Sequence, residues 1–226
     1  MANNLDLEEQ EQLDQLKHFW KQYGNLITWA LILVLGAFAG WNLYQRWQQN
    51  QGSQAAALYD EVERVAKTGD MAKLDRVIAD MKDKFPGTTY AQQAVLMSAK
   101  VYFEAGKIEQ AKSSLSWVVE KSSDEGYQAI ARLRLAAVLM EAKAFDEAFK
   151  QLNGAFPVEF AALVADRKGD IFSLQGKKAE AKAEYEKAYK AFGDRAEYRL
   201  LVEVKLNALG VNPRPDADMA ALEGKK

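Results

Sequence analysis

The feature that most constrains this chain is an uncharged run near its amino end, between Lys21 and Arg46. The run covers 24 residues, Gln22–Gln45, and contains the apolar stretch "LITWALILVLGAFAGW". An α-helix of this length extends about 36 Å, which exceeds the hydrocarbon thickness of a typical bilayer. The run therefore predicts a single transmembrane helix over residues 22–45, preceded by a short arm of residues 1–21.

Aromatic side chains gather at both ends of this run. Trp and Tyr favour the headgroup level of a membrane, because each has an apolar ring and a polar group. The two groups are Trp20, Tyr23 and Trp29 at one end, and Trp41, Tyr44 and Trp47 at the other. Burial inside a soluble protein gives no reason for such a pattern, so we favour a membrane anchor over a core helix.

The run also contains one feature of a cleaved signal peptide, the small-residue pattern "AFA" at residues 37–39. Two observations oppose cleavage. A signal peptide begins with a short basic segment, whereas residues 1–21 contain 5 acidic side chains and only two lysines, Lys17 and Lys21. The aromatic anchor pattern also continues past this site to Trp47. We therefore predict a permanent anchor.

The orientation of the anchor depends on the cations that flank it, because the cytoplasmic side usually carries more Lys and Arg. Lys17 and Lys21 precede the run, and Arg46 follows it. This difference favours a cytoplasmic amino terminus and a C-terminal domain across the membrane. A bias of two cations against one leaves the opposite orientation open.

Two glycines inside the run are spaced one helical turn apart, in "GAFAG". Small residues at this spacing allow another membrane helix to approach closely. Gly36 and Gly40 are therefore our candidate docking face for a partner helix. The alternative is that glycine and alanine are simply common in membrane helices.

The residues beyond a polar link at 46–54 are rich in Ala, Glu, Lys and Leu, and the whole chain has only 4 prolines. Apolar residues recur there at helical spacing, as in Leu58, Val62 and Val65. Sustained alternation of apolar and polar residues is absent from the sequence. We therefore expect an all-α fold, with one helical domain over residues 55–210 and a flexible tail over residues 211–226.

The helical domain contains an internal repeat. Three copies are separated by 37 and 33 residues: "AKVYFEAGKIEQA" (99–111), "AAVLMEAKAFDEA" (136–148) and "GDIFSLQGKKAEA" (169–181). Each copy opens with a small residue, turns at its eighth position (Gly106, Lys143 or Gly176) and ends on alanine. The pattern resembles the tetratricopeptide repeat, in which two antiparallel helices touch where both carry small side chains. We expect a solenoid of helix pairs, with a weaker first copy that turns at "TGD" (68–70).

Such a solenoid presents a concave surface built from the first helix of each pair. Apolar side chains on that surface suit an extended or helical peptide segment of a protein partner. The repeat phase predicts these surface residues: Leu96, Lys100, Phe103, Ile130, Leu133, Met140, Leu163 and Asp170. For the apolar members, packing between neighbouring repeats is the alternative interpretation.

Several kinds of chemistry have no support in the sequence. The chain has no cysteine, which excludes disulfides, thiol catalysis and thiolate metal sites. Residues 51–226 hold 27 basic and 27 acidic residues, so this part has no net attraction for nucleic acid. His18 is the only histidine, and the sequence contains no glycine-rich phosphate loop. We expect no catalytic site, cofactor, metal, small-molecule substrate or nucleic-acid partner.

The order of these parts resembles a known family. The segment "LKHFWKQYG" (16–24) leads into the apolar run, which ends in "GWNLYQ" (40–45) before the repeat domain. In this combination the chain is similar to the ancillary SecYEG translocon subunit family. The resemblance implies a bacterial inner-membrane protein with a cytoplasmic amino terminus and a periplasmic repeat domain. It also implies association with the SecYEG translocon and the periplasmic chaperone PpiD, and assistance to proteins that leave the translocon.

A second function remains open from the residues alone. A membrane-tethered repeat protein also fits a scaffold or adaptor of another envelope complex, or of stress signalling, unrelated to secretion. The repeat motif serves many kinds of partner and does not choose between these functions.

Overall fold

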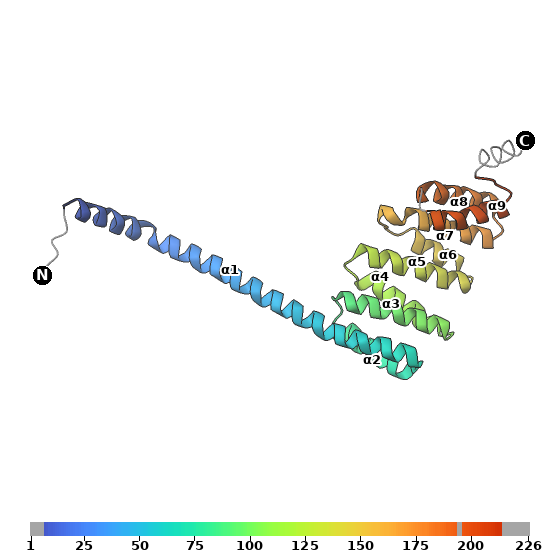
Figure 1. Ribbon diagram of the computed structural model, residues 1–226, viewed down its shortest axis with the longest axis horizontal. Helices are drawn as coiled ribbons and strands as arrows, with labels where there is room; N and C mark the ends of the chain where they lie inside the picture. The colour runs from blue at the N-terminus through green and yellow to red at the C-terminus, as the bar shows by residue number, and fades with distance from the viewer. Residues whose placement is uncertain (1–6, 194–195, 214–226) are drawn as a thin grey trace, which may run out of the picture. The chain divides into compact units, whose positions relative to one another are not determined.

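The computed structural model describes residues 7–193 and 196–213, and every regular element within these ranges is a helix (Figure 1). The predicted all-α fold is therefore confirmed. The elements are α1 (Leu7–Thr68), α2 (Met71–Lys84), α3 (Thr89–Glu104), α4 (Ile108–Lys121), α5 (Glu125–Glu141), α6 (Phe145–Leu152), the 3-10 helix η1 (Val158–Phe160), α7 (Ala161–Leu174), α8 (Lys178–Phe192) and α9 (Ala196–Ala208).

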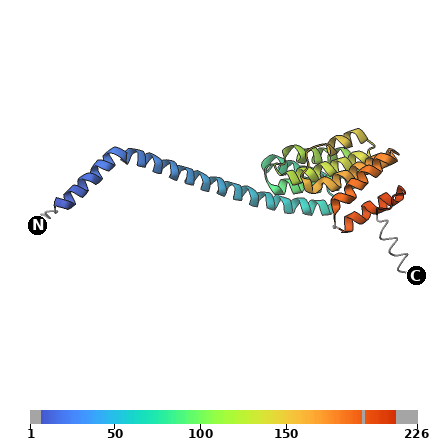
Figure 2. The ribbon, with the colours of Figure 1, turned by 90° about the horizontal axis from the view of Figure 1, so that it is seen from above.

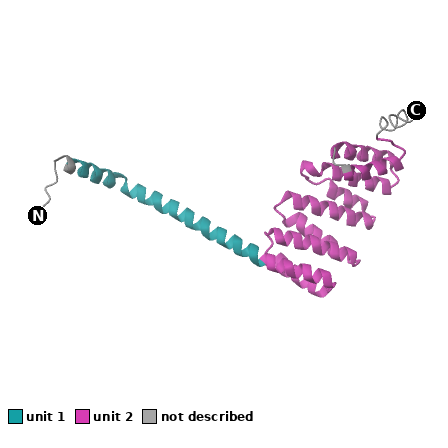
Figure 3. Ribbon diagram, in the orientation of Figure 1, with its two compact units in different colours: residues 1–54 teal, residues 55–226 magenta. Residues whose placement is uncertain are grey.

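The chain divides into two compact units, residues 1–54 and 55–226 (Figure 3). Helix α1 runs through the boundary, so residues 46–54 are helical and the predicted polar link forms part of this helix. Among the described residues, α1 is the one helix that is long and apolar enough to cross a membrane.

In the first unit, the apolar side chains of α1 are exposed along the predicted anchor. Leu33 and Phe38 keep 74% and 67% of their surface accessible. In the second aromatic group, the Tyr44 ring lies 6.5 Å from the Trp41 ring and 6.1 Å from the Trp47 ring, with the rings tilted against each other. An apolar surface of this extent requires lipid or protein around it, because water hydrates it unfavourably. The exposure therefore agrees with a membrane-spanning role.

In the second unit, Val62 at the end of α1 and Leu74 of α2 belong to one hydrophobic cluster. The pairs α3–α4, α5–α6 and α7–α8 follow before α9 closes the series (Figure 1). Seen from above, the helices of this unit run alongside one another (Figure 2). The first helices of successive pairs also contact each other, α3 with α5 and α5 with α7. This arrangement is the predicted solenoid of helix pairs.

The turns inside the pairs lie where the repeat predicted them. Gly69, Gly106, Lys143 and Gly176 have φ angles of 72°, 73°, 57° and 75°, in the left-handed region that ends a helix. After Lys143, the backbone N–H of Ala144 donates to the carbonyl of Leu139 at 2.9 Å. The turns after α3 and α7 make the same bond at equivalent positions.

Close contact between the paired helices depends on the small residues of the repeat. The small residues that open and close the three copies are all buried: Ala99, Ala136, Gly169, Ala111, Ala148 and Ala181. The tightest contact is at Gly169, where an added Cβ would lie 2.5 Å from the ring of Tyr185. This position therefore requires glycine, because a methyl group there would overlap the aromatic ring.

The buried side chains form two hydrophobic clusters that meet at α7. The first extends from Ala55 at the end of α1 to Leu152 on α6, and includes Ile171 of α7. The second lies between α7, α8 and α9. Phe149 and Phe172 join the two clusters, with their ring centroids 4.8 Å apart.

Several helix ends carry residue types that favour a cap. Asp124 accepts the N–H of Tyr127 at 3.0 Å and caps α5. Gly210 follows α9 with a φ of 79°. Asp194, a residue type that commonly caps helices, and most of the expected tail (residues 214–226) lie outside the described residues.

Candidate partner-binding groove

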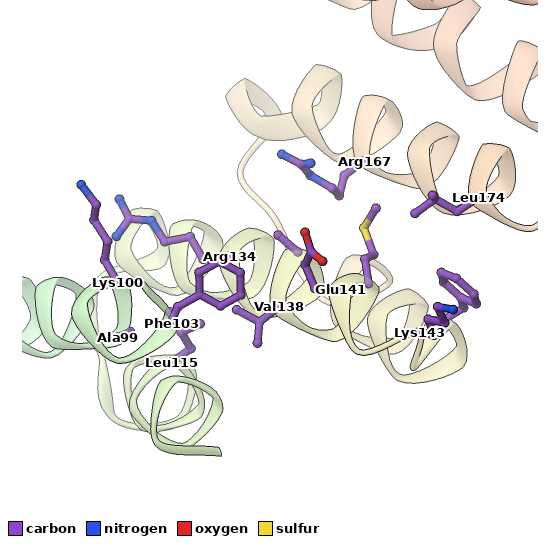
Figure 4. Close-up of a pocket in the computed structure, with 13 residues that line it drawn as sticks. Ala99, Lys100, Phe103, Leu115, Arg134, Val138, Glu141, Lys143, Arg167 and Leu174 are labelled. Atoms are coloured by element: carbon purple, nitrogen blue, oxygen red, sulfur yellow. The ribbon is translucent and has the colours of Figure 1, made fainter. Parts of the chain in front are cut away.

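A groove of about 810 Å³ lies along the first helices of the solenoid (Figure 4). Helices α3, α5 and α7 supply most of its walls, with additional residues from α4 and from the turn and start of α6. The lining residues are Ala99, Lys100, Phe103, Leu115, Arg134, Ala137, Val138, Met140, Glu141, Lys143, Phe145, Arg167 and Leu174.

Large apolar side chains in this groove remain accessible. Leu174 is 62% exposed and Phe103 is 36% exposed, while Met140 is half-buried between them along the solenoid. Figure 4 shows Phe103 and Leu174 on opposite parts of the groove. Exposed apolar side chains within a concave surface are typical of peptide-binding sites, because a partner can bury them.

The groove is also rich in cations. Lys100, Arg134, Lys143 and Arg167 line it, against one carboxylate, Glu141. Two of these cations have partners on their own helices: the Lys100 Nζ atom lies 3.7 Å from Glu104 Oε1, and Arg167 Nη1 lies 3.2 Å from Asp170 Oδ2.

Arg134 is held differently from these two. Its Nη1 atom donates to the carbonyl oxygen of Leu96 at 3.4 Å, across from α5 to α3. Within residues 7–193 and 196–213, no ion pair neutralises Arg134 or Lys143. The groove therefore carries positive charge in a domain whose total charge is balanced.

The groove includes three residues of the predicted concave surface, Lys100, Phe103 and Met140. The other five predicted residues do not line it. Leu96 is buried in the first cluster, Ile130 and Leu133 pack against that cluster, Leu163 packs against the second, and Asp170 belongs to a polar network. A role of these five residues in partner binding stays a prediction. The four apolar residues among them pack within the hydrophobic clusters of the solenoid.

Sequence reasoning missed two important groove residues, Leu174 and Arg134. Leu174 is the sixth residue of its repeat copy, where the other two copies have Glu104 and Glu141. Arg134 lies two residues before the opening Ala136 of its copy, just outside the motif that was compared. The signal for Leu174 was an apolar residue where the other two copies have glutamate, and the signal for Arg134 was the arginine repeated at Arg167, two residues before the third copy.

Asp170 lies in a partly buried polar network that joins the last three helices. Lys205 on α9 donates to Asp166 at 2.7 Å and to Asp170 at 2.6 Å, both on α7. The Tyr185 hydroxyl of α8 donates to the same Asp170 oxygen at 2.9 Å. Burial raises the pKa of the Asp166 carboxyl, although its hydrogen bond from Lys205 opposes the shift. The network holds α9 against the solenoid.

The described residues contain no group of three or more His, Asp or Glu side chains arranged to bind a metal ion. On α1, Gly36 and Gly40 present an open surface, since a Cβ added at either would meet no atom within 4 Å. Their role as a docking face for another membrane helix stays a prediction.

Comparison with known proteins identifies the family. Residues 17–211 match the family model of a tetratricopeptide repeat-like domain. The chain is 32% identical over 204 residues to the ancillary SecYEG translocon subunit of Neisseria gonorrhoeae and 33% identical over 203 residues to that of Haemophilus influenzae. Each alignment covers 90% of this chain and 98% of the relative. The Escherichia coli protein of the same name is 28% identical over 206 residues, which cover 90% of this chain and 97% of that protein. This chain belongs to the ancillary SecYEG translocon subunit family.

Proposed function

We propose that this protein is a membrane-anchored, non-catalytic subunit that associates with the SecYEG translocon and assists proteins that leave it. The observation that carries this proposal is the similarity, over 90% of the chain, to three proteins named ancillary SecYEG translocon subunit. The tetratricopeptide repeat-like domain supports a role in binding proteins, since such solenoids present extended binding surfaces.

The proposed location is the bacterial inner membrane, with the amino terminus in the cytoplasm and the repeat domain in the periplasm. The exposed apolar surface of α1 supports a membrane-spanning segment. Lys17 and Lys21 before this segment and Arg46 after it favour the proposed orientation. The repeat domain would then lie where secreted chains emerge from the translocon.

The groove is the proposed contact surface for protein partners, which include the emerging chains and the chaperone PpiD. Its accessible Phe103 and Leu174 side chains offer apolar contacts that a bound segment would bury. A contact of this kind needs no reacting group, which agrees with the non-catalytic role that we propose.

Co-purification of SecYEG with the affinity-tagged full chain tests the association. Membranes would be dissolved in an uncharged detergent, and the recovered SecYEG compared with that from a strain with an untagged chain. Enrichment of SecYEG with the tagged protein is expected. Recovery of SecYEG at the background level would contradict the proposal and leave a scaffold of another envelope complex as the function.

The same experiment locates the contact within the membrane. Replacing both glycines by leucine (Gly36→Leu with Gly40→Leu) fills the surface that a partner helix would approach, so co-purification should fall about tenfold if this face docks. A control with Val34→Leu and Phe38→Leu changes residues on the opposite side of the helix. Normal recovery with the glycine variant would remove the docking face but not the association.

A further inference from the structure

Two arginines of the groove occupy the same register in consecutive repeats. Arg134 lies two residues before Ala136, and Arg167 lies two residues before Gly169, the residues that open the second and third copies. Both arginines line the groove, one on α5 and one on α7. Because repeated units stack side by side, the repeat places a second guanidinium group farther along the same groove.

A lysine stands beside the first of these arginines. The Arg134 guanidinium contacts the carbonyl oxygen of Leu96, and Lys100 lies one helical turn after Leu96 on α3. Figure 4 shows Lys100 and Arg134 extended in the same direction at one end of the groove. Arg134 is exposed, and 71% of the Lys100 side chain is accessible. Lys100 also lies 3.7 Å from Glu104, but this exposed pair contributes little energy, so both cations can bind one further anionic group.

Charged and apolar side chains lie near one another at both ends of the groove. Figure 4 shows Phe103 beside Lys100 and Arg134 at one end, and Leu174 at the other end, on the side where Lys143 lies. The volume of about 810 Å³ is in the range of sites that hold a few side chains rather than a folded domain. The surface thus suits a short chain segment that carries both apolar and anionic side chains.

We propose that this groove binds a peptide segment of a partner protein in which Glu or Asp side chains alternate with large apolar residues. A carboxylate of the segment pairs with the guanidinium fork of Arg134 and with Lys100, a geometry that favours carboxylates. The apolar residues cover Phe103 and Leu174. The inference rests on the proposed function in taking the groove as the partner surface, and it adds the chemistry of the segment that is selected.

The test measures peptide binding to the purified full chain in an uncharged detergent. The probe is a short fluorescent synthetic peptide of Leu and Phe residues with Glu between them, and two matched peptides carry Gln or Lys in place of Glu. The Glu peptide should bind about tenfold more tightly than the Gln peptide, and this difference should shrink as salt is added. Equal binding of the Glu and Gln peptides, or no binding of the Glu peptide, would overturn the inference.

Charge reversal locates the binding site. The variant with Lys100→Glu and Arg134→Glu should bind the Glu peptide about tenfold more weakly and should come to prefer the Lys peptide. The control variant, Arg76→Glu with Lys190→Glu, changes the net charge equally at exposed positions outside the groove. An equal loss in the control, at an unchanged melting temperature of both variants, would show a general charge effect and contradict the inference.

The peptide-binding experiment and the co-purification experiment can fail independently of each other. A chain that co-purifies with SecYEG but binds the Glu and Gln peptides equally would reject the acidic segment alone. A chain that prefers the Glu peptide but does not co-purify with SecYEG would reject the translocon association alone.

Discussion

Lys143 adopts the left-handed backbone conformation of the repeat turn, although a residue with a Cβ is poorly suited to it. It is the one non-glycine residue with a positive φ in the described parts of the chain, at the turn where the neighbouring copies have glycine. A residue with a Cβ is strained in this conformation by about 1 kcal/mol or more. The surrounding helix pair therefore determines the turn, because the residue itself opposes it.

Replacing Lys143 by glycine should raise the stability of the domain by about 1 kcal/mol, since the strain is removed. For a domain of this size the melting temperature should rise by about 3 °C, which circular dichroism of the full chain would measure. Lys143→Ala is the matched control, because it removes the same side chain but keeps the Cβ. An equal rise in both variants would mean that the lysine side chain, and not the backbone, is the source of strain.

The opposite change is expected at Gly176, whose φ is 75°. Gly176→Ala introduces a Cβ in the same left-handed conformation and should lower the stability by about 1 kcal/mol. Space is not the reason, because an added Cβ there meets no atom within 4 Å. Gly87→Ala is the control, since that site is equally open and its φ is outside the strained range. Similar melting temperatures for the two alanine variants would contradict this account.

At the scale of elements, α9 is held by a network that couples its stability to pH. Burial raises the pKa of Asp166 in the folded protein above its ordinary value, so the folded state binds this proton more tightly than the unfolded state does. The contribution of Asp166 to stability is therefore present in full below its ordinary pKa near 3.8, and it is lost as the pH rises through the raised value.

The raised pKa of Asp166 gives a prediction for the variant Asp166→Asn. The free energy of unfolding of the natural protein, minus that of the variant, should increase as the pH is lowered from neutrality towards 4. Urea unfolding of the two full chains at a series of pH values measures the difference. The control is Asp80→Asn, at an exposed residue whose carboxylate pairs with Lys84 on the surface. A difference that stays constant or falls on acidification would contradict the raised pKa.

Removing Lys205, the cation paired with Asp166, should lower the stability more than a change of pH does. Lys205→Met leaves Asp166, with 2% of its side chain exposed, without the cation that contacts it. The variant should lose roughly 2 kcal/mol, less than for a fully buried pair because Lys205 itself is partly exposed. Hydrogen exchange of α9 should rise first, since Lys205 ties this helix to α7. Unchanged exchange in α9 would show that Val202 and Leu206 are sufficient to hold it.

The sequence predicted the elements better than it predicted the contacts between them. The turns at Gly106 and Gly176 follow from a local pattern, because a small set of residues near each turn specifies it. The contact between Asp166 and Lys205 joins residues 39 positions apart and depends on how α9 packs against α7. The groove also depends on packing between distant elements. Leu174 and Arg134 line the same surface only after the helix pairs have stacked.

At the scale of the whole molecule, the membrane anchor determines where the groove can act. The proposed orientation places the repeat domain in the periplasm, where it would be accessible from outside the inner membrane. Protease added to spheroplasts should therefore digest the repeat domain, while a cytoplasmic marker protein stays intact. Digestion of the repeat domain only after lysis would contradict the proposed orientation.

Site-specific photocrosslinking in cells tests the proposal that the groove contacts proteins on the periplasmic side of the translocon. A photoreactive amino acid would replace Leu174 in the groove or Ser113, which is exposed on α4 outside the groove. We expect crosslinks to SecYEG, PpiD or secreted chains from position 174, and far fewer from position 113. Crosslinks to cytoplasmic proteins, or equal yields of the same products from both positions, would contradict it.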